Sequence, residues 1–241
     1  MNFKNTELNN WYKTNAGIIN SRLIISTINK IFSSDVKKNI LYFGEYSIVK
    51  KLMDVDQSFN SYYVSLSEKS DIKSELNKLP FQESSIDCVI LIHSLDSQND
   101  PHSAFREIDR VLTDDGKMIT VGFNKNSFLG IYSIMPFKSI FKKKKYISIG
   151  RLSDWMSLFS YEVKQVFNIN KVPPVKNNNI LRNLKFLNND FFSKVNLFGN
   201  CYVIYSCKKT YKYITVKNWH KKNNIVLGKF SKPIIHNNFD E

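Results

Sequence analysis

The clearest hydrophobic pattern in the chain lies between residues 79 and 122. Residues Ile86–Ile92 form an almost unbroken apolar run, which is typical of a β-strand covered on both faces. Asp100 followed by Pro101 is a helix-start signal, because an aspartate side chain accepts hydrogen bonds from free N–H groups and proline suits the first turn. The pattern therefore predicts a buried strand followed by a helix.

The residues after this start signal predict one amphipathic helix and a second strand. Apolar side chains recur at helical spacing at Ala104, Phe105, Ile108, Val111 and Leu112. Asp115-Gly116 predicts a turn, and Met118–Val121 begins the next strand. A strand, a helix and a strand in this order predict parallel pairing through a right-handed crossover.

The same reasoning extends to both ends of the chain. Residues 7–32 carry an apolar stripe with Gly17 as a weak point, and they predict one long helix. The other predicted elements are strands at Asn39–Gly44, Tyr62–Leu66, Tyr161–Phe167 and Cys201–Cys207, and a helix at Arg151–Phe159. Strands and helices that alternate in this way predict an α/β fold.

Composition adds a charge asymmetry to this picture. The 241 residues carry a net charge of +14. Eight lysines and no acid lie within residues 208–232, and four more lysines form Lys142–Lys145, so the rest of the chain is nearly neutral. Such basic segments favour weak contact with nucleic acid or an anionic membrane, and a solubilising tail is the plainer interpretation.

Cysteine usage and the polar N-terminus favour a cytoplasmic protein. Cys88 lies in an apolar strand, and Cys201 and Cys207 share one face of a predicted strand without CxxC spacing, which suits a reducing compartment. The N-terminal residues are polar and do not resemble a secretory signal. The histidines show no metal-ligand spacing, so no metal site is expected.

Several of these segments together resemble a known family. They are Leu79-Pro80-Phe81, Ile86-Asp87 and its strand, Asp100-Pro101, Arg106-Glu107-Ile108, Arg110-Val111-Leu112 and Asp115-Gly116. Their order and spacing are similar to the middle of a class I S-adenosylmethionine-dependent methyltransferase, of the type 11 branch. The resemblance implies a Rossmann-like domain with a mostly parallel, seven-stranded sheet and helices on both faces.

The resemblance also implies a domain organisation and a function. We expect an N-terminal helical extension at residues 1–34, a methyltransferase-like domain at residues 35–209 and a basic tail at residues 210–241. Insertions are expected at 126–150 and 171–194, and the apolar part of the first, residues 128–137, predicts either an acceptor-pocket lid or an interfacial helix. The implied reaction is transfer of a methyl group from S-adenosylmethionine to a small, apolar molecule.

The family pattern assigns a cofactor site to particular residues. Glu75, four residues before Leu79, matches the family's adenine-binding position, and Leu76 is placed to pack on the ring. His93, after the fourth strand, is a candidate general base near the reacting end, and lining the loop is its alternative role. The complete predicted site consists of Gly44, Glu45, Ser65, Glu75, Leu76 and His93.

Two departures from the family pattern affect this site. Gly44 is the only glycine where the family has GxGxG, and Glu45, Tyr46 and Ser47 follow it, so side chains there can intrude into the cofactor space. Ser65 or Leu66 stands where the family has a ribose-binding acid, and Glu68 is displaced by two or three residues.

These departures keep two other functions open. One is a methyltransferase fold that no longer catalyses and serves as a binding module. The other is an RNA-associated methyltransferase that uses the basic tail, although the Asn/Asp-Pro-Pro-Tyr/Phe motif of base methylation is absent from the sequence.

Overall fold

The computed structural model describes residues 3–32, 39–55, 60–127, 130, 146–170 and 199–209. These belong to one compact unit, Met1–Thr210, and a second unit, Tyr211–Glu241, lies outside the described residues. The predicted lid at 128–137, Lys142–Lys145, the insertion at 171–194 and the tail at 210–241 also fall outside the described residues, apart from Gly130. None of the described helices is long and apolar enough to span a bilayer.

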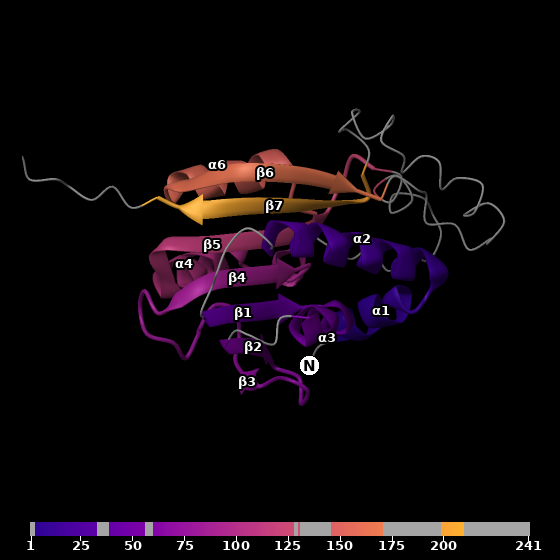
Figure 1. Cartoon of the computed structure of the whole chain (residues 1–241), viewed down its shortest axis with the longest axis horizontal. Coiled ribbons are helices and arrows are strands. Elements are labelled where there is room, and N and C mark those ends of the chain that lie inside the picture. Colours follow the sequence, from indigo (N-terminus) through magenta and orange to yellow (C-terminus); the bar gives the residue numbers. More distant parts are fainter. Residues whose placement is uncertain are drawn as a thin grey trace, which may run out of the picture. The chain divides into compact units, whose positions relative to one another are not determined.

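A seven-stranded sheet forms the centre of the first unit (Figure 1). Its strands are β1 (Asn39–Gly44), β2 (Asn60–Ser65), β3 (Ile72–Lys73), β4 (Ile86–Ile92), β5 (Leu112–Phe123), β6 (Tyr161–Ile169) and β7 (Cys201–Lys208). They lie in the order β3-β2-β1-β4-β5-β7-β6. The first five pair in parallel, and β7 is antiparallel to both of its neighbours. The predicted mostly parallel sheet is confirmed.

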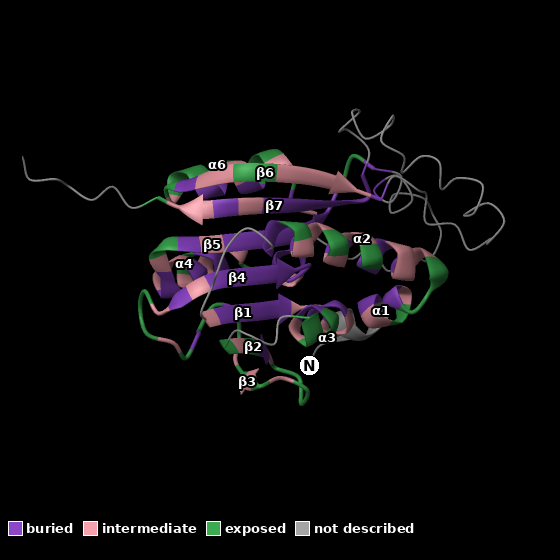
Figure 2. Cartoon of the chain, in the orientation of Figure 1, coloured by how far each residue is buried: buried purple, intermediate pink, exposed green. Residues whose placement is uncertain are grey.

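Helices cover both faces of this sheet, as predicted (Figure 1). On one face lie α1 (Phe3–Tyr12), α2 (Asn15–Phe32) and α3 (Tyr46–Val55), and on the other lie α4 (Pro101–Val111) and α6 (Ile149–Leu158). Side chains of β1 alternate between the two layers, because Tyr42 packs with the first set of helices and Leu41 with the second. The central strands β1 and β4 are therefore buried on both faces (Figure 2).

The cap at the start of α4 is the one that the sequence predicts. The Asp100 carboxylate accepts hydrogen bonds from the backbone N–H groups of His102, at 3.0 Å, and Ser103, at 3.2 Å. The bond from Ser103, and then that from His102, lowers the pKa of Asp100 below its ordinary value. This cap fixes where the loop after β4 ends and the helix begins.

The prediction of one helix over residues 7–32 is wrong, because the chain turns between α1 and α2. The Thr14 hydroxyl donates to the Trp11 carbonyl at 2.6 Å and accepts from the Gly17 N–H at 3.3 Å. It thereby satisfies backbone groups at the end of one helix and at the start of the next. A Cβ atom on Gly17 would lie 2.2 Å from the Trp11 carbonyl oxygen, so the turn depends on glycine at this position.

The predicted turn at Asp115-Gly116 lies inside β5 rather than before it. The strand begins at Leu112, whose backbone is already extended at the end of α4. Ile86 of β4 pairs with Leu112, and Cys88 pairs with Lys117. The intervening residues of β5 therefore form an irregularity in the ladder. The two-residue β3 was not predicted, because it is too short to carry an apolar pattern.

We predict that Gly17→Ala destabilises the domain, by about 1–3 kcal/mol, because the new methyl group overlaps the Trp11 carbonyl. Helix propensity alone predicts the opposite sign. Gly150→Ala is the matched control, since a Cβ there meets nothing within 4 Å and is expected to be neutral or stabilising. Urea unfolding of both variants measures the difference, and a Gly17→Ala protein as stable as the control would contradict this account of the turn.

Candidate functional site

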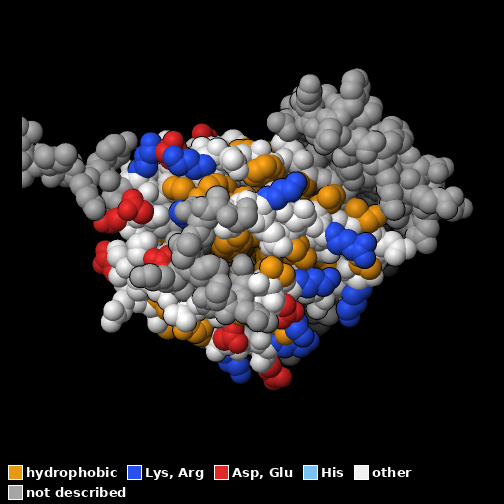
Figure 3. All heavy atoms as spheres, in the orientation of Figure 1, with side chains coloured by type: hydrophobic (Ala, Val, Ile, Leu, Met, Phe, Trp, Pro, Cys, Tyr) orange, Lys and Arg blue, Asp and Glu red, His pale blue; other side chains and the backbone are white. Residues whose placement is uncertain are grey.

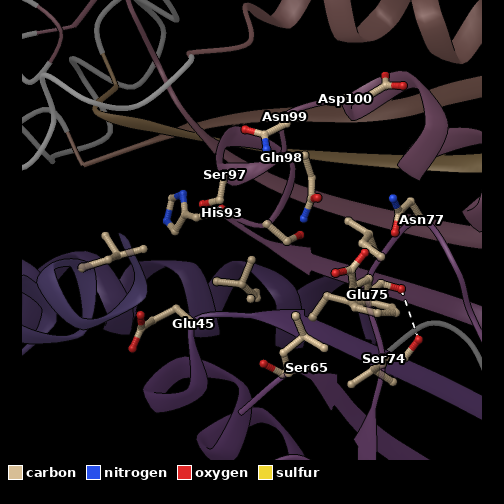
Figure 4. A pocket seen from close by; sticks show the side chains of 18 residues that line it. Glu45, Ser65, Ser74, Glu75, Asn77, His93, Ser97, Gln98, Asn99 and Asp100 are labelled. Atoms are coloured by element: carbon tan, nitrogen blue, oxygen red, sulfur yellow. Dashed lines mark hydrogen bonds between the residues drawn. The ribbon is translucent and has the colours of Figure 1, made fainter. Parts of the chain in front are cut away.

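The carboxyl ends of β1, β2 and β4 surround a cavity of about 340 Å³, within the size range of small-molecule sites. All six residues of the predicted site line it: Gly44, Glu45, Ser65, Glu75, Leu76 and His93. They come from four separate segments of the chain. Figure 4 shows the labelled side chains around this cavity.

The floor of the cavity is a close contact between the ends of β1 and β4. Gly44 has φ +107°, and a Cβ atom on it would lie 1.8 Å from the Ile92 carbonyl oxygen. The same oxygen accepts a hydrogen bond from the Glu45 N–H at 3.2 Å. Glycine is therefore required here by the packing of one strand end against the other, before any ligand is considered.

Glu45 lines the cavity directly after Gly44, at the position where the glycine turn is altered. One of its carboxylate oxygens accepts hydrogen bonds from the Ser47 hydroxyl, at 3.1 Å, and the Ser47 N–H, at 3.4 Å. Its side chain is 5% exposed. The carboxylate thus caps the N-terminus of α3, where a negative charge is favoured.

Tyr46 and Ser47 are not among the described residues that line the cavity. The Tyr46 ring packs against Tyr63, with ring centroids 5.4 Å apart, and the Lys69 ammonium lies 5.2 Å from the Tyr46 ring centroid. Since α3 begins directly at Tyr46, the turn is too short to carry these side chains into the cavity. The expected intrusion is therefore limited to Glu45.

Residues at the end of β2 line the cavity without supplying an acid. Ser65 and Leu66 both contribute to the wall, and Glu68 does not. The Ser65 hydroxyl accepts a hydrogen bond from the Ser67 N–H at 3.3 Å. The Leu66 side chain is 54% exposed, which leaves an apolar surface that a flat ring can cover.

Glu75 and Leu76 lie on a turn closed by a bridge between Glu75 and Lys78. The Ser74 hydroxyl donates to the Lys78 carbonyl and stabilises this turn. Leu76 is buried against the core. The exposed Glu75 side chain points into the cavity (Figure 4), so this turn presents one carboxylate above an apolar base.

An ion pair on α4 holds the segment that follows this turn. Glu107 accepts from the Leu79 N–H at 2.8 Å and from the Arg110 guanidinium at 2.7 Å. Arg110 also donates to the carbonyls of Leu79 and Phe81. Its hydrogen bonds are the main cause of the lowered pKa of Glu107. The pair therefore fixes the backbone just beyond Glu75.

His93 is buried and contacts protein groups on several sides, although it lines the cavity. Its backbone is left-handed, with φ +54°, and its side chain is buried. The ring stacks on Phe123 with centroids 3.8 Å apart. Its Nε2 lies 2.6 Å from the Tyr12 hydroxyl, and its Nδ1 lies 3.8 Å from an Asp96 carboxylate oxygen. Both ring nitrogens face protein groups, and a catalytic role for His93 stays a prediction.

The N-terminal helices contribute residues to the site that are not among the six predicted ones. Leu8 of α1 lines the cavity, and Tyr12 of the same helix contacts His93. A signal in the sequence is the polar residue Asn20 within the apolar stripe of α2. A buried polar side chain needs a hydrogen-bond partner, so this face of the helix contacts other polar groups. The loop after β4 adds Ser97, Gln98 and Asn99 to the wall.

The described lining is acidic, although the protein is basic. It contains Glu45, Glu75 and Asp100 and neither lysine nor arginine. Basic side chains lie elsewhere: Arg22 of α2 and Lys51 of α3 are exposed, and Figure 3 shows lysine and arginine side chains spread over the surface. Within the described ranges, no group of three or more His, Cys, Asp or Glu side chains is placed to hold a metal ion. The cavity therefore favours a cationic organic ligand.

We predict that Glu107→Gln lowers the free energy of unfolding by about 1 kcal/mol near neutral pH, since it removes a partly exposed ion pair. Because the pKa of folded Glu107 is lowered, this stabilisation is present above the carboxyl's unfolded pKa of about 4.3 and is lost as the pH falls through the folded value. The free energies of unfolding of the wild type and of Glu107→Gln, measured against pH, should therefore become equal in acid. Glu68→Gln is the exposed control, and a constant difference down to about pH 2 would contradict the role of the pair.

Comparison with known proteins agrees with this geometry. Residues 38–120 match a family model described as a methyltransferase domain. The uncharacterized protein YafS of Escherichia coli (strain K12) is 37% identical over 97 residues, a match that spans 39% of this chain and 40% of that protein.

Solved structures with the same fold cover more of the chain. A methyltransferase of Thermotoga maritima, described as a possible histamine N-methyltransferase, has a TM-score of 0.59 and 18% identity, over 85% of this chain and 96% of that chain. A putative methyltransferase in complex with the Trm112 activator of Haloferax volcanii has a TM-score of 0.58 and 14% identity, over 85% of this chain and 98% of that chain. Residues 38–120 therefore match a methyltransferase-domain model, and the chain shares its fold with S-adenosylmethionine-dependent methyltransferase structures.

Proposed function

We propose that this chain binds S-adenosylmethionine in the cavity at the ends of β1, β2 and β4 and transfers its methyl group to a small, apolar molecule. The observation that carries the proposal is the acidic lining of Glu45, Glu75 and Asp100 in a chain of net charge +14. S-adenosylmethionine, the cofactor of this family, supplies an electrophilic methyl group on a positively charged sulfur. Carboxylates around the cavity stabilise that charge.

The same lining argues against phosphate-bearing nucleotides. Dinucleotide sites on related folds use several glycines and a free helix N-terminus to bind a pyrophosphate. Here the N-terminus of α3 is capped by the Glu45 carboxylate, which repels a phosphate in that position. Electrostatics therefore favour an adenosyl sulfonium over an adenosyl diphosphate.

The residues of the cavity divide naturally between the two ends of such a ligand. Glu75 is placed to accept hydrogen bonds from the adenine amino group, with Leu66 and Leu76 as apolar surfaces for the ring. Ser65 offers a hydroxyl to the ribose. Glu45 is placed to pair with the ammonium group of the methionine part, and in Figure 4 its side chain points away from Glu75.

Positioning accounts for the chemistry that these residues can perform. Direct displacement at the sulfonium needs the acceptor atom close to the methyl carbon and in line with its bond to sulfur. Holding both reactants in one cavity lowers the activation barrier, because their translational and rotational entropy is already lost when they bind. The Nε2 atom of His93 is hydrogen-bonded to Tyr12. The described part of the site therefore fits an acceptor that is nucleophilic without a histidine base. The predicted acceptor-pocket lid at residues 128–137 stays a prediction, because apart from Gly130 these residues are outside the described part of the chain.

The small-molecule acceptor is preferred over RNA for a structural reason. Lys208 and Lys209, the described lysines of the basic segment, are ion-paired with Asp109 at 3.1 Å and Glu162 at 2.9 Å. Both pairs hold the end of β7 to the domain, and in both a carboxylate offsets the lysine charge. Cys88, Cys201 and Cys207 are free thiols, which supports a cytoplasmic location.

We predict that the protein binds S-adenosylmethionine and that Glu75→Gln weakens binding about tenfold, the usual effect of losing a charged hydrogen-bond acceptor. Glu45→Gln should also weaken binding, through the ammonium end of the ligand. Isothermal titration calorimetry measures both effects, with Glu68→Gln as the control outside the cavity.

The same titration with ATP and NAD tests the electrostatic argument. We expect neither to bind at concentrations that saturate the protein with S-adenosylmethionine. If ATP bound as well as the sulfonium, or if millimolar S-adenosylmethionine did not bind, the proposal would be overturned, and a non-catalytic binding module would be the better account of the fold.

A further inference from the structure

A chain of buried polar side chains connects the site to the N-terminal helices. The Tyr12 hydroxyl lies 2.6 Å from His93 Nε2, and Asn20 Nδ2 donates to the same hydroxyl at 3.3 Å. Asn20 also contacts the Cys201 sulfur at 3.1 Å and accepts from Asn170 at 3.3 Å. Tyr12, Asn20 and His93 are all at least 96% buried, so these contacts are shielded from water.

The donors and acceptors of this chain are all used when the Tyr12 hydroxyl donates to His93 Nε2, whereas the reverse direction leaves the hydroxyl proton without an acceptor among these contacts. Burial raises the pKa of Tyr12 well above its ordinary value, so the hydroxyl keeps its proton. Its oxygen accepts from Asn20, and its proton is directed to His93 Nε2. A hydroxyl that donates to Nε2 requires that nitrogen to be unprotonated. The imidazole is then neutral, with its proton on Nδ1.

Among the charged and ionisable groups near His93 and Tyr12, Asp96 favours the protonated imidazole. Asp96, from the short helix η1 (Leu95–Ser97), has a carboxylate oxygen 3.8 Å from Nδ1, and a carboxylate at this distance favours the imidazolium. Glu45, before α3, and Cys201, on β7, act electrostatically on Tyr12. Burial raises the pKa of the Cys201 thiol to about 12, so it is neutral. Phe123 covers one ring face without charge.

We propose that Tyr12 is a positioning residue of the methyl-transfer site: its hydroxyl holds His93 as the neutral Nδ1–H tautomer and so keeps a positive charge away from the cofactor cavity. The consequence for the cofactor rests on the proposed function. A cationic ligand and an imidazolium in one cavity repel each other. Because Tyr12 lies on α1, the site accepts a sulfonium only when α1 is packed against the sheet.

The first part of the test needs no ligand and reads the wild-type protein directly. In protein labelled with ¹⁵N in its histidine rings, two-bond ¹H–¹⁵N correlation spectra report which nitrogen of each ring is protonated. The sequence has four histidines, at positions 93, 102, 220 and 236, and a His93→Gln sample assigns the signal. We expect Nε2 of His93 to be unprotonated and Nδ1 protonated from about pH 7.5 to about pH 5.5, across the usual histidine titration range.

The second part compares Tyr12→Phe with a matched control. The substitution keeps the edge-on ring contact with Trp11 and removes only the hydroxyl. Without the hydrogen bond to Nε2, nothing from Tyr12 counteracts the effect of the Asp96 carboxylate, which favours the imidazolium. We expect His93 to titrate about one pH unit higher than in the wild-type protein. S-adenosylmethionine affinity should then fall about tenfold between pH 7.5 and pH 5.5, against little change in the wild type. Tyr202→Phe is the control, because this buried tyrosine donates to the Ile147 carbonyl at 3.0 Å in the other core layer.

The outcomes are separable from those of the proposed function. The Nε2–H tautomer in the wild-type protein would overturn the inference, as would an unchanged His93 titration in a folded Tyr12→Phe protein. If the tautomer and the titration behave as expected but the protein binds no S-adenosylmethionine, the Tyr12–His93 contact stands and the methyltransferase proposal fails. A pH-dependent loss of affinity equal in Tyr12→Phe and Tyr202→Phe would mean that Tyr12 has only a structural role.

Discussion

The contact between Gly44 and Ile92 is the constraint on which the site depends. At the ends of β1 and β4 the two backbones approach so closely that a Cβ on Gly44 would lie 1.8 Å from the Ile92 oxygen. That oxygen accepts the Glu45 N–H, which turns the chain directly into α3. Because β1 ends there without a longer loop, the Glu45 carboxylate reaches the N-terminus of its own helix. One close backbone contact thus brings the floor of the cavity and one of its three acidic residues together.

A second close contact, at Gly17, brings the N-terminal helices to the same place. The turn between α1 and α2 packs Gly17 against the Trp11 carbonyl and aligns Tyr12 and Asn20 on the inner side of the hairpin, where they bond to each other. Tyr12 then reaches His93, which stands at the end of β4 just beyond Ile92. The hairpin is therefore a part of the wall of the site, and its stability and the state of His93 are physically linked.

The sequence predicts the parts of the fold that are decided locally or by burial on both faces. The bounds of β1 and β4 follow from unbroken apolar runs, and the start of α4 follows from Asp100, whose cap depends only on its neighbours. The six predicted site residues line one cavity because their positions relative to the recognised motifs place them at strand ends or on the turn after β3. The turn between α1 and α2 and the bond from Tyr12 to His93 join residues through tertiary packing. No periodicity within one segment contains that information.

The reduced glycine turn changes which force selects the ligand. In a turn with several glycines, backbone N–H groups approach the ligand and bind its anionic parts. Here that helix N-terminus is occupied by the Glu45 carboxylate, and the remaining polar groups of the described lining are acids, amides and hydroxyls. In the proposed function, recognition relies on the positive charge of the ligand and on apolar contact at Leu66 and Leu76, which line the cavity. Such a site must exclude positively charged protein groups, since each added positive charge offsets one of its carboxylates. The hydrogen bond from Tyr12 to the single buried imidazole of the described lining meets that requirement.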